Sequence, residues 1–299
     1  MKKIKPASYW EKKGNKVKCL LCPNNCIISD SKTGKCSVRI NVGGVLYSLT
    51  DGHYVSEAID PIEKKPLYNF HRGDLVYSIG TAGCNLTCLF CQNYQLVSLP
   101  TQFINNFQTS DKNIVDRAIE SKCKGIAFTY NEPTMNYEQM YRIAKLAKEK
   151  GLYTVAVSNG YLNEGPMKEI TEVIDAWNID LKGISEDFYK NICGGRPGPV
   201  IRNIQIANEK SHVEVTFLLI DEINSKDEEI DELARNLLKI NPNISLHISR
   251  YFPNKKMNIP ATKLETMKRA YDISKNHLNN VYLGNLTSAE LSFIDIDYQ

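Results

Sequence analysis

Three cysteines stand close together on the segment that follows the apolar run 75–79, at the spacing Cys84-x3-Cys88-x2-Cys91. Three thiolates on one short loop can bind three irons of a single [4Fe–4S] cluster. A cluster held by four cysteines is coordinatively closed and suits electron transfer, whereas one held by three leaves an iron open to a ligand from outside the protein. The alternatives are three unrelated thiols or a zinc site that lacks its fourth ligand. The strand-then-loop context favours the cluster.

A second group of cysteines lies near the amino terminus, at the spacing Cys19-x2-Cys22-x3-Cys26-x9-Cys36. Four thiols can close a tetrahedral Zn²⁺ site or hold a second iron–sulfur cluster. The spacing matches neither the usual zinc-ribbon pattern nor the bacterial ferredoxin run. We slightly favour zinc over an auxiliary cluster, because a small module with little core gains stability from a bound metal.

The composition is that of a soluble globular protein, with 299 residues of which 42% are hydrophobic and 24% are charged. A net charge of +3 is too small to indicate nucleic-acid binding. No apolar run approaches the ~20 residues that span a bilayer, and the first residues lack the apolar core of a signal peptide. Nine cysteines without a secretion signal favour metal chemistry in a reducing compartment. We therefore expect a cytoplasmic protein with no membrane or nucleic-acid partner, and buried thiols at the isolated Cys123 and Cys193.

From residue 75 onward, strand-like apolar runs alternate with amphipathic helical patterns. Such repeats form parallel strands joined by right-handed crossovers. Six repeats instead of eight predict an α/β fold, a partial and splayed (βα)6 TIM-like barrel with its site at the carboxyl ends of the strands. The predicted strands are 75–80, 125–130, 153–158, 176–180, 212–220 and 245–251, with a short run at 281–283; the predicted helices are 114–122, 137–150, 165–171, 200–208, 227–239 and 262–275.

The chain divides into three parts on this pattern. Residues 1–74 do not follow the alternation and contain the first four cysteines. We therefore expect them to form a small cysteine-rich module packed on the barrel. Residues 75–285 form the barrel, and residues 286–299 form a tail.

Polar side chains follow several predicted strands and are candidates for binding a ligand. Lys182 can bind a carboxylate, and Asp180 can lie near a cation or position the lysine. Polar residues on the inner face of a barrel must be hydrogen-bonded or functional. We consider His247 and Arg250 as catalytic candidates, although a structural histidine is the interpretation we favour for His247. The candidate ligand-binding residues are Asn131, Glu132, Ser158, Asn159, Asp180, Lys182 and Glu214.

The cysteine loop, with the aromatic Phe90 before its third cysteine, resembles that of the radical S-adenosylmethionine (SAM) enzymes. In that superfamily the open iron binds the amino and carboxylate groups of SAM. The resemblance implies that Asn131 and Glu132 lie near the methionine amino group, in the place of a Gly-Gly-Glu-Pro segment whose glycines are replaced here. It also implies that Ser158 and Asn159 lie near the ribose, and that the Asp180–Lys182 pair lies near the sulfonium and carboxylate.

Further stretches resemble the radical SAM enzyme of the AmmeMemoRadiSam system, a relative of the pyruvate formate-lyase activating enzyme. The most specific are Asp60–Leu67 and Tyr130–Thr134. The resemblance implies an external electron donor of the flavodoxin or ferredoxin type, reductive cleavage of SAM to a 5′-deoxyadenosyl radical, and hydrogen abstraction from an unidentified substrate. Activation of a glycyl radical enzyme, with a protein substrate, is one alternative, and a non-catalytic iron–sulfur scaffold is another. The Cys-Pro-x-x-Cys segment that often follows the final Gly-Asn in such proteins is missing after Gly284-Asn285.

Overall fold

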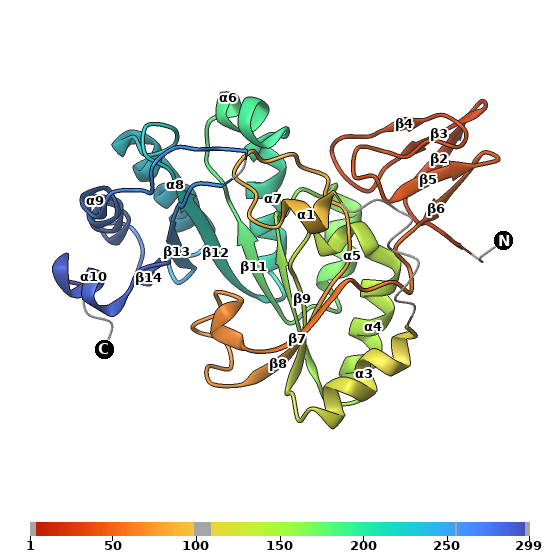
Figure 1. Ribbon diagram of the computed structural model, residues 1–299, viewed down its shortest axis with the longest axis horizontal. Helices are drawn as coiled ribbons and strands as arrows, with labels where there is room; N and C mark the ends of the chain where they lie inside the picture. Colours follow the sequence, from red (N-terminus) through yellow and green to blue (C-terminus); the bar gives the residue numbers. More distant parts are fainter. Residues whose placement is uncertain (1–3, 99–108, 255, 297–299) are drawn as a thin grey trace.

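The computed structural model describes residues 4–98, 109–254 and 256–296, and its centre is an eight-stranded sheet (Figure 1). The strand order is β14-β13-β12-β11-β10-β9-β8-β7, and every pair is parallel except the edge pair of β7 and β8. The strands are β7 (Ser56–Pro61), β8 (Leu75–Gly80), β9 (Gly125–Phe128), β10 (Tyr153–Ser158), β11 (Ala176–Asp180), β12 (His212–Leu219), β13 (Ser245–Arg250) and β14 (Val281–Gly284).

Helices connect the successive parallel strands, and the predicted partial barrel is confirmed. Each predicted helix is present with its ends shifted by a few residues; the first begins earlier, at Asp111, because the Ser110 side chain accepts a hydrogen bond from the backbone of Asn113. None of the described helices is long and apolar enough to span a bilayer. The helices are α1 (Tyr94–Val97), α3 (Asp111–Glu120), α4 (Tyr137–Glu149), α5 (Glu164–Thr171), α6 (Glu186–Phe188), α7 (Pro197–Asn208), α8 (Asp227–Ile240), α9 (Leu264–Lys275) and α10 (Ser288–Phe293).

The amino-terminal residues form two small antiparallel sheets, seen beside the barrel in Figure 1. One has the order β1-β6-β5 and the other β2-β3-β4. Strand β7 departs from the predicted division at residue 75, because it pairs with β8 and extends the main sheet. The strands of the two small sheets are β1 (Lys5–Pro6), β2 (Trp10–Lys13), β3 (Lys16–Cys19), β4 (Ile27–Ile28), β5 (Arg39–Val42) and β6 (Val45–Ser48).

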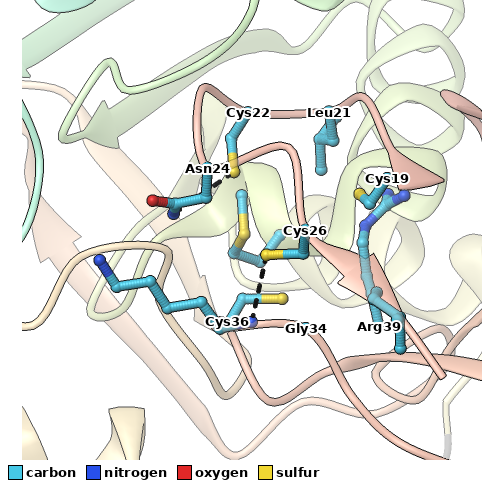
Figure 2. A pocket seen from close by; sticks show the side chains of 11 residues that line it. Cys19, Leu21, Cys22, Asn24, Cys26, Gly34, Cys36 and Arg39 are labelled. Atoms are coloured by element: carbon cyan, nitrogen blue, oxygen red, sulfur yellow. Dashed lines mark hydrogen bonds between the residues drawn. The ribbon is translucent and has the colours of Figure 1, made fainter.

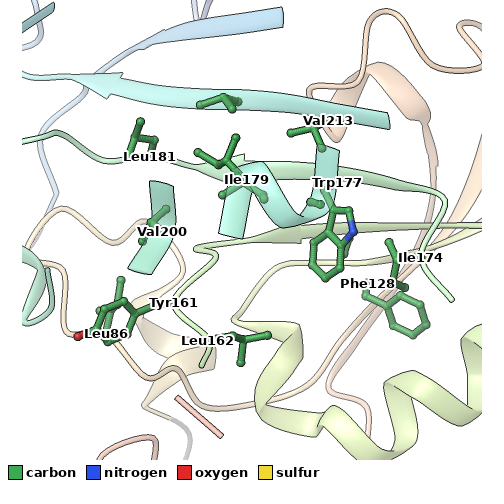
Figure 3. Packing of buried hydrophobic residues seen from close by; sticks show 14 of the residues in the cluster. Leu86, Phe128, Tyr161, Leu162, Ile174, Trp177, Ile179, Leu181, Val200 and Val213 are labelled. Atoms are coloured by element: carbon green, nitrogen blue, oxygen red, sulfur yellow. The ribbon is translucent and has the colours of Figure 1, made fainter. Parts of the chain in front are cut away.

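Side chains of β11 alternate between the two faces of the sheet, so that apolar residues enter the core and polar residues lie on the opposite face. Trp177 and Ile179 are fully buried among apolar side chains, including Val200 of α7 (Figure 3). Asn178 and Asp180 point to the opposite face. Asn178 donates to the carbonyl of Pro66 at 2.8 Å and accepts from Thr216. Burying each large apolar side chain stabilises the fold by about 2 kcal/mol, so the strand ends that carry the polar residues are held on a rigid base.

Candidate active site

A cavity of about 720 Å³ opens at the carboxyl ends of the parallel strands. Its volume is within the range of sites that bind small molecules and cofactors. The cavity brings together nine of the residues predicted from the sequence: Cys36, Cys84, Cys88, Cys91, Asn131, Glu132, Asn159, Asp180 and Lys182. Ser158 does not line it, but its hydroxyl donates to Glu132 at 2.8 Å.

The loop that carries Cys84, Cys88 and Cys91 is fixed by hydrogen bonds to distant parts of the chain. The Asn85 side chain donates to the carbonyl of Tyr161 at 2.7 Å. The Thr87 amide donates to the carbonyl of Cys193 at 2.8 Å. The loop is therefore held in shape by the strand connections around it.

Gly83, immediately before the first cysteine of this loop, lies against the amino-terminal module. Its φ is +84°, a conformation that favours glycine. A Cβ atom there would lie 2.6 Å from the carbonyl oxygen of Cys36 and 2.7 Å from a methyl group of Val38. Only glycine therefore allows the two backbones to approach this closely.

The three thiols have the environment that a metal–thiolate site needs. Cys84 Sγ accepts from the Leu86 amide at 3.4 Å and from the Asn159 side chain at 3.5 Å. Burial raises the pKa of Cys84 and of Cys91, so a bound metal must displace their protons. Cys193, buried as predicted, donates to Cys88 and lowers the pKa of that thiol.

The thiols do not gather around a single point. Across residues 4–98, 109–254 and 256–296, no three His, Cys, Asp or Glu side chains converge as they would around one metal ion. A four-iron cluster does not require this convergence, because each cysteine binds its own iron at a separate corner. The donor set and its hydrogen bonds fit a [4Fe–4S] cluster open at one iron.

Glu132 joins the ends of two neighbouring strands. Its carboxylate accepts hydrogen bonds from the hydroxyl and amide of Thr134, from the Ser158 hydroxyl, and from the Asn159 amide at 2.8 Å. Burial raises its pKa, and these hydrogen bonds partly offset that shift. Three of the four bonds go to one oxygen, so the other oxygen keeps acceptor capacity toward the cavity.

Asn131 holds the start of the cysteine loop. Its side-chain oxygen accepts from the Thr81 amide at 3.0 Å, and its nitrogen donates to the carbonyls of Ala82 and Gly83. The preceding residue, Tyr130, has a φ of 73°. The predicted strand 125–130 therefore ends at Phe128, because this left-handed conformation turns the chain out of the sheet.

Lys182 and Asp180 form an ion pair at the cavity wall, with 3.0 Å between Nζ and the carboxylate. Burial alone would lower the pKa of Lys182, but Asp180 and the neighbouring sulfur of Cys88 raise it well above its usual range. The ammonium also lies 5.6 Å from the centre of the Phe90 ring. Lys182 thus keeps a positive charge beside the cysteine loop.

Three predicted candidates lie outside the cavity. Glu214 is fully buried nearer the amino end of β12, where it accepts from the Asn69 amide at 2.8 Å and contacts His247 Nε2 at 2.6 Å. Arg250 donates to the Thr262 carbonyl and pairs with Glu290 at 2.7 Å. Glu214 and His247 are on the inner face but too deep to reach the cavity, and the favoured structural interpretation of His247 agrees with its contact to Glu214. Arg250 ends β13 next to Ser249, which lines the cavity, but its own side chain contacts Thr262 and Glu290 instead.

The cavity is also lined by residues that the sequence did not single out as ligand-binding. Lys65 pairs with Asp60 at 2.7 Å, and Tyr130 donates to the same carboxylate oxygen at 2.8 Å. These bonds hold the pKa of Asp60 well below its usual range, although burial opposes them. Lys64, Thr216 and Ser249 also line the cavity. The run of charges in Asp60–Leu67 was the available sequence signal.

The amino-terminal cysteines also lie together. Cys19, Cys22, Cys26 and Cys36 all line one small cavity next to Arg39 (Figure 2). Burial raises the pKa of the Cys22 thiol to about 12 and also raises that of Cys36.

Known proteins show what this chain is similar to. The family model of the radical SAM superfamily matches residues 78–237. An "uncharacterized protein" of Methanocaldococcus jannaschii is 38% identical over 96% of this chain and 87% of its own length. The pyruvate formate-lyase-activating enzyme of Clostridium pasteurianum is 25% identical over 56% of this chain and 75% of its own length.

Among solved structures, Streptococcus suis SuiB bound to S-adenosylmethionine has the same fold. Its TM-score is 0.56 at 15% sequence identity, and the match covers 80% of this chain and 56% of that one. The family match includes the three-cysteine loop and most of the residues that line the cavity. The chain therefore belongs to the radical SAM superfamily.

Proposed function

We propose that this protein is a radical SAM enzyme that cleaves SAM reductively and removes a hydrogen atom from its substrate. The observation that carries the proposal is the placement of three cysteines on one braced loop at the wall of a cofactor-sized cavity. Glu132 and Lys182 line the same cavity. The thiols need a reducing compartment, so we propose that the enzyme acts in the cytoplasm with an external one-electron donor.

Cys84, Cys88 and Cys91 would hold the cluster. Such a cluster would supply the electron for reductive cleavage of the S–C5′ bond of SAM, the reaction that would yield the 5′-deoxyadenosyl radical for hydrogen abstraction. The remaining chemistry of the site is binding and orientation. Lys182 offers a buried cation to a carboxylate, and Glu132 keeps one oxygen available to an amino group. Asn131 fixes the backbone on which both the loop and Glu132 depend.

The test is anaerobic incubation of reconstituted protein with SAM and dithionite. We expect methionine and 5′-deoxyadenosine in equal amounts. Cys88→Ala should abolish both products and reduce the iron content, whereas Cys123→Ala, at a buried cysteine outside both cavities, should keep them. A reducible, fully loaded cluster that yields no 5′-deoxyadenosine would refute the proposal. An electron paramagnetic resonance (EPR) spectrum that SAM does not change would favour an iron–sulfur scaffold instead.

Activation of a glycyl radical enzyme is a second candidate. It is favoured by similarity to two proteins named as activating enzymes, for pyruvate formate-lyase and for 4-hydroxyphenylacetate decarboxylase, at 25% and 24% identity. On this reading the substrate is the backbone glycine of a partner protein. Incubation with a candidate partner should then produce the EPR doublet of a glycyl radical. Hydrogen abstraction from a small molecule gives no such doublet.

A further inference from the structure

The four amino-terminal cysteines come from separate turns and still meet at one cavity (Figure 2). Cys19 ends β3, Cys22 and Cys26 lie in the connection to β4, and Cys36 precedes β5. Cys19, Cys22 and Cys36 are buried. The cavity measures about 10 Å³, roughly the room needed by one water molecule or ion.

Polar hydrogens point at these sulfurs. The Lys35 amide donates to Cys26 Sγ at 3.5 Å, and the Asn24 side chain donates to Cys22 Sγ at 3.7 Å. The same kind of contact supports Cys84 in the radical SAM loop, where the Leu86 amide donates at 3.4 Å. Both sets of cysteines thus receive N–H donors at sulfur, contacts that also support metal-bound thiolates.

A buried positive charge lines the same cavity. Arg39 is 1% exposed, and its Nε has no hydrogen-bond partner. Its other nitrogens donate to the Ser8 carbonyl at 2.9 Å and to Glu138 at 2.6 Å. An unpartnered buried N–H is costly. A centre of four thiolates and one metal carries net negative charge and would provide the acceptor that this N–H lacks.

This module is in direct contact with the radical SAM loop. The Asn24 side chain, which reaches Cys22 Sγ, also donates to the carbonyl of Asn85 at 2.7 Å, and Asn85 follows Cys84. Cys36 lines both cavities. Its carbonyl faces Gly83 at the closest approach of the two segments. The two cysteine sets are thus joined by one asparagine and share a wall.

We propose that Cys19, Cys22, Cys26 and Cys36 form a second metal–thiolate centre, and that this centre braces the loop of the first through Asn24. The four cysteines line one cavity, but among the described residues no three such side chains converge on one point. Zinc would therefore require the thiols to turn inward onto one ion, whereas a cluster binds each cysteine at its own iron, and metal analysis distinguishes the two. The bracing role rests on the proposed function, since it requires a cluster at Cys84–Cys91. The existence of the second centre is independent of the proposed function.

The first experiment removes the radical SAM ligands and leaves the amino-terminal module intact. A folded Cys84→Ala/Cys88→Ala/Cys91→Ala variant should retain about one zinc or about four irons per chain. Adding Cys22→Ser should release that metal, whereas adding Cys123→Ser should not. A folded triple variant without stoichiometric metal would overturn the proposal. Because this variant cannot hold the first cluster, its result is independent of SAM cleavage.

The second experiment tests the bracing. In the full enzyme we measure how fast a chelator removes the EPR signal that responds to SAM, which only the first cluster gives. Asn24→Ala removes one hydrogen bond between the sites, and the signal should decay about fivefold faster. Asn113→Ala, an exposed asparagine on α3, should leave the decay unchanged. Equal decay in the two variants would refute the bracing role even if the second metal is present.

Discussion

Replacing Gly83 with alanine should loosen the contact between the cysteine loop and the amino-terminal module. Two costs apply at this position. The positive φ of +84° costs alanine about 1 kcal/mol. The added methyl would lie 2.6 Å from the Cys36 carbonyl, which must move, and such overpacking costs a further 1 to 3 kcal/mol or so. The total is about 2 to 4 kcal/mol, or a fall in melting temperature of about 2 °C for each kcal/mol.

Gly151 provides the matched control, because its φ is +76° and nothing lies within 4 Å of its added Cβ. Gly151→Ala should therefore show the backbone cost alone, about 1 kcal/mol. Thermal unfolding of both variants, with iron content measured in parallel, separates the backbone cost of the positive φ from the cost of overpacking. If Gly83→Ala is no less stable than Gly151→Ala and keeps its iron, the close approach of the two backbones does not fix the loop.

Three further predictions concern the rest of the barrel. Hydrogen bonds from His212 and His247 outweigh burial and lower the pKa of Glu214 to about 2, against 4.5 ordinarily. This depressed value stabilises the fold by about 3 kcal/mol above pH 4.5 or so, and the contribution is lost as the pH falls toward 2. The melting temperatures of wild type and Glu214→Gln should therefore converge on acidification; a constant gap down to pH 2 would contradict this assignment. Asp60→Asn leaves the Lys65 charge buried without its partner and should cost about 3 kcal/mol, whereas Lys64→Ala, at an exposed lysine, should change stability little. Trp177→Ala should cost about 3 to 5 kcal/mol in thermal unfolding, because the indole is completely buried in the core.

The sequence predicted well those elements and residues whose place in the fold follows from the residue pattern in their own segment. The Asp180–Lys182 pair was predicted as ligand-binding from its place after the strand 176–180, and both residues line the cavity. Repeated βα units predicted the parallel sheet. The residue types at Cys84, Glu132 and Lys182 indicated their place at the strand ends, and all three line the cavity. The sheet follows from short-range periodicity, and the site residues follow from short motifs next to the strand ends.

Other parts depend on contacts that no local pattern shows. Glu214 has the inward direction of Thr216 but lies two residues earlier, and that depth brings it to Asn69 and His247 instead of the cavity. The six residues of β7 join the main sheet through antiparallel pairing with β8, although the surrounding sequence has no repeat that continues the barrel. The tail contains α10, whose capping box pairs Thr287 with Glu290.

The bonds that shape the cysteine loop also constrain the order in which the protein matures. Asn85 is hydrogen-bonded to Asn24, 61 residues earlier in the chain, and to Tyr161, 76 residues later. The Thr87 amide is hydrogen-bonded to the carbonyl of Cys193. Contacts between distant segments form late, because the chain entropy lost in closing long loops must be overcome first. During synthesis Asn24 leaves the ribosome before the loop, whereas Tyr161 and Cys193 leave it well after. The loop therefore reaches its final shape only on a nearly finished barrel, and a chain truncated before Cys193 lacks one of the hydrogen bonds that hold it.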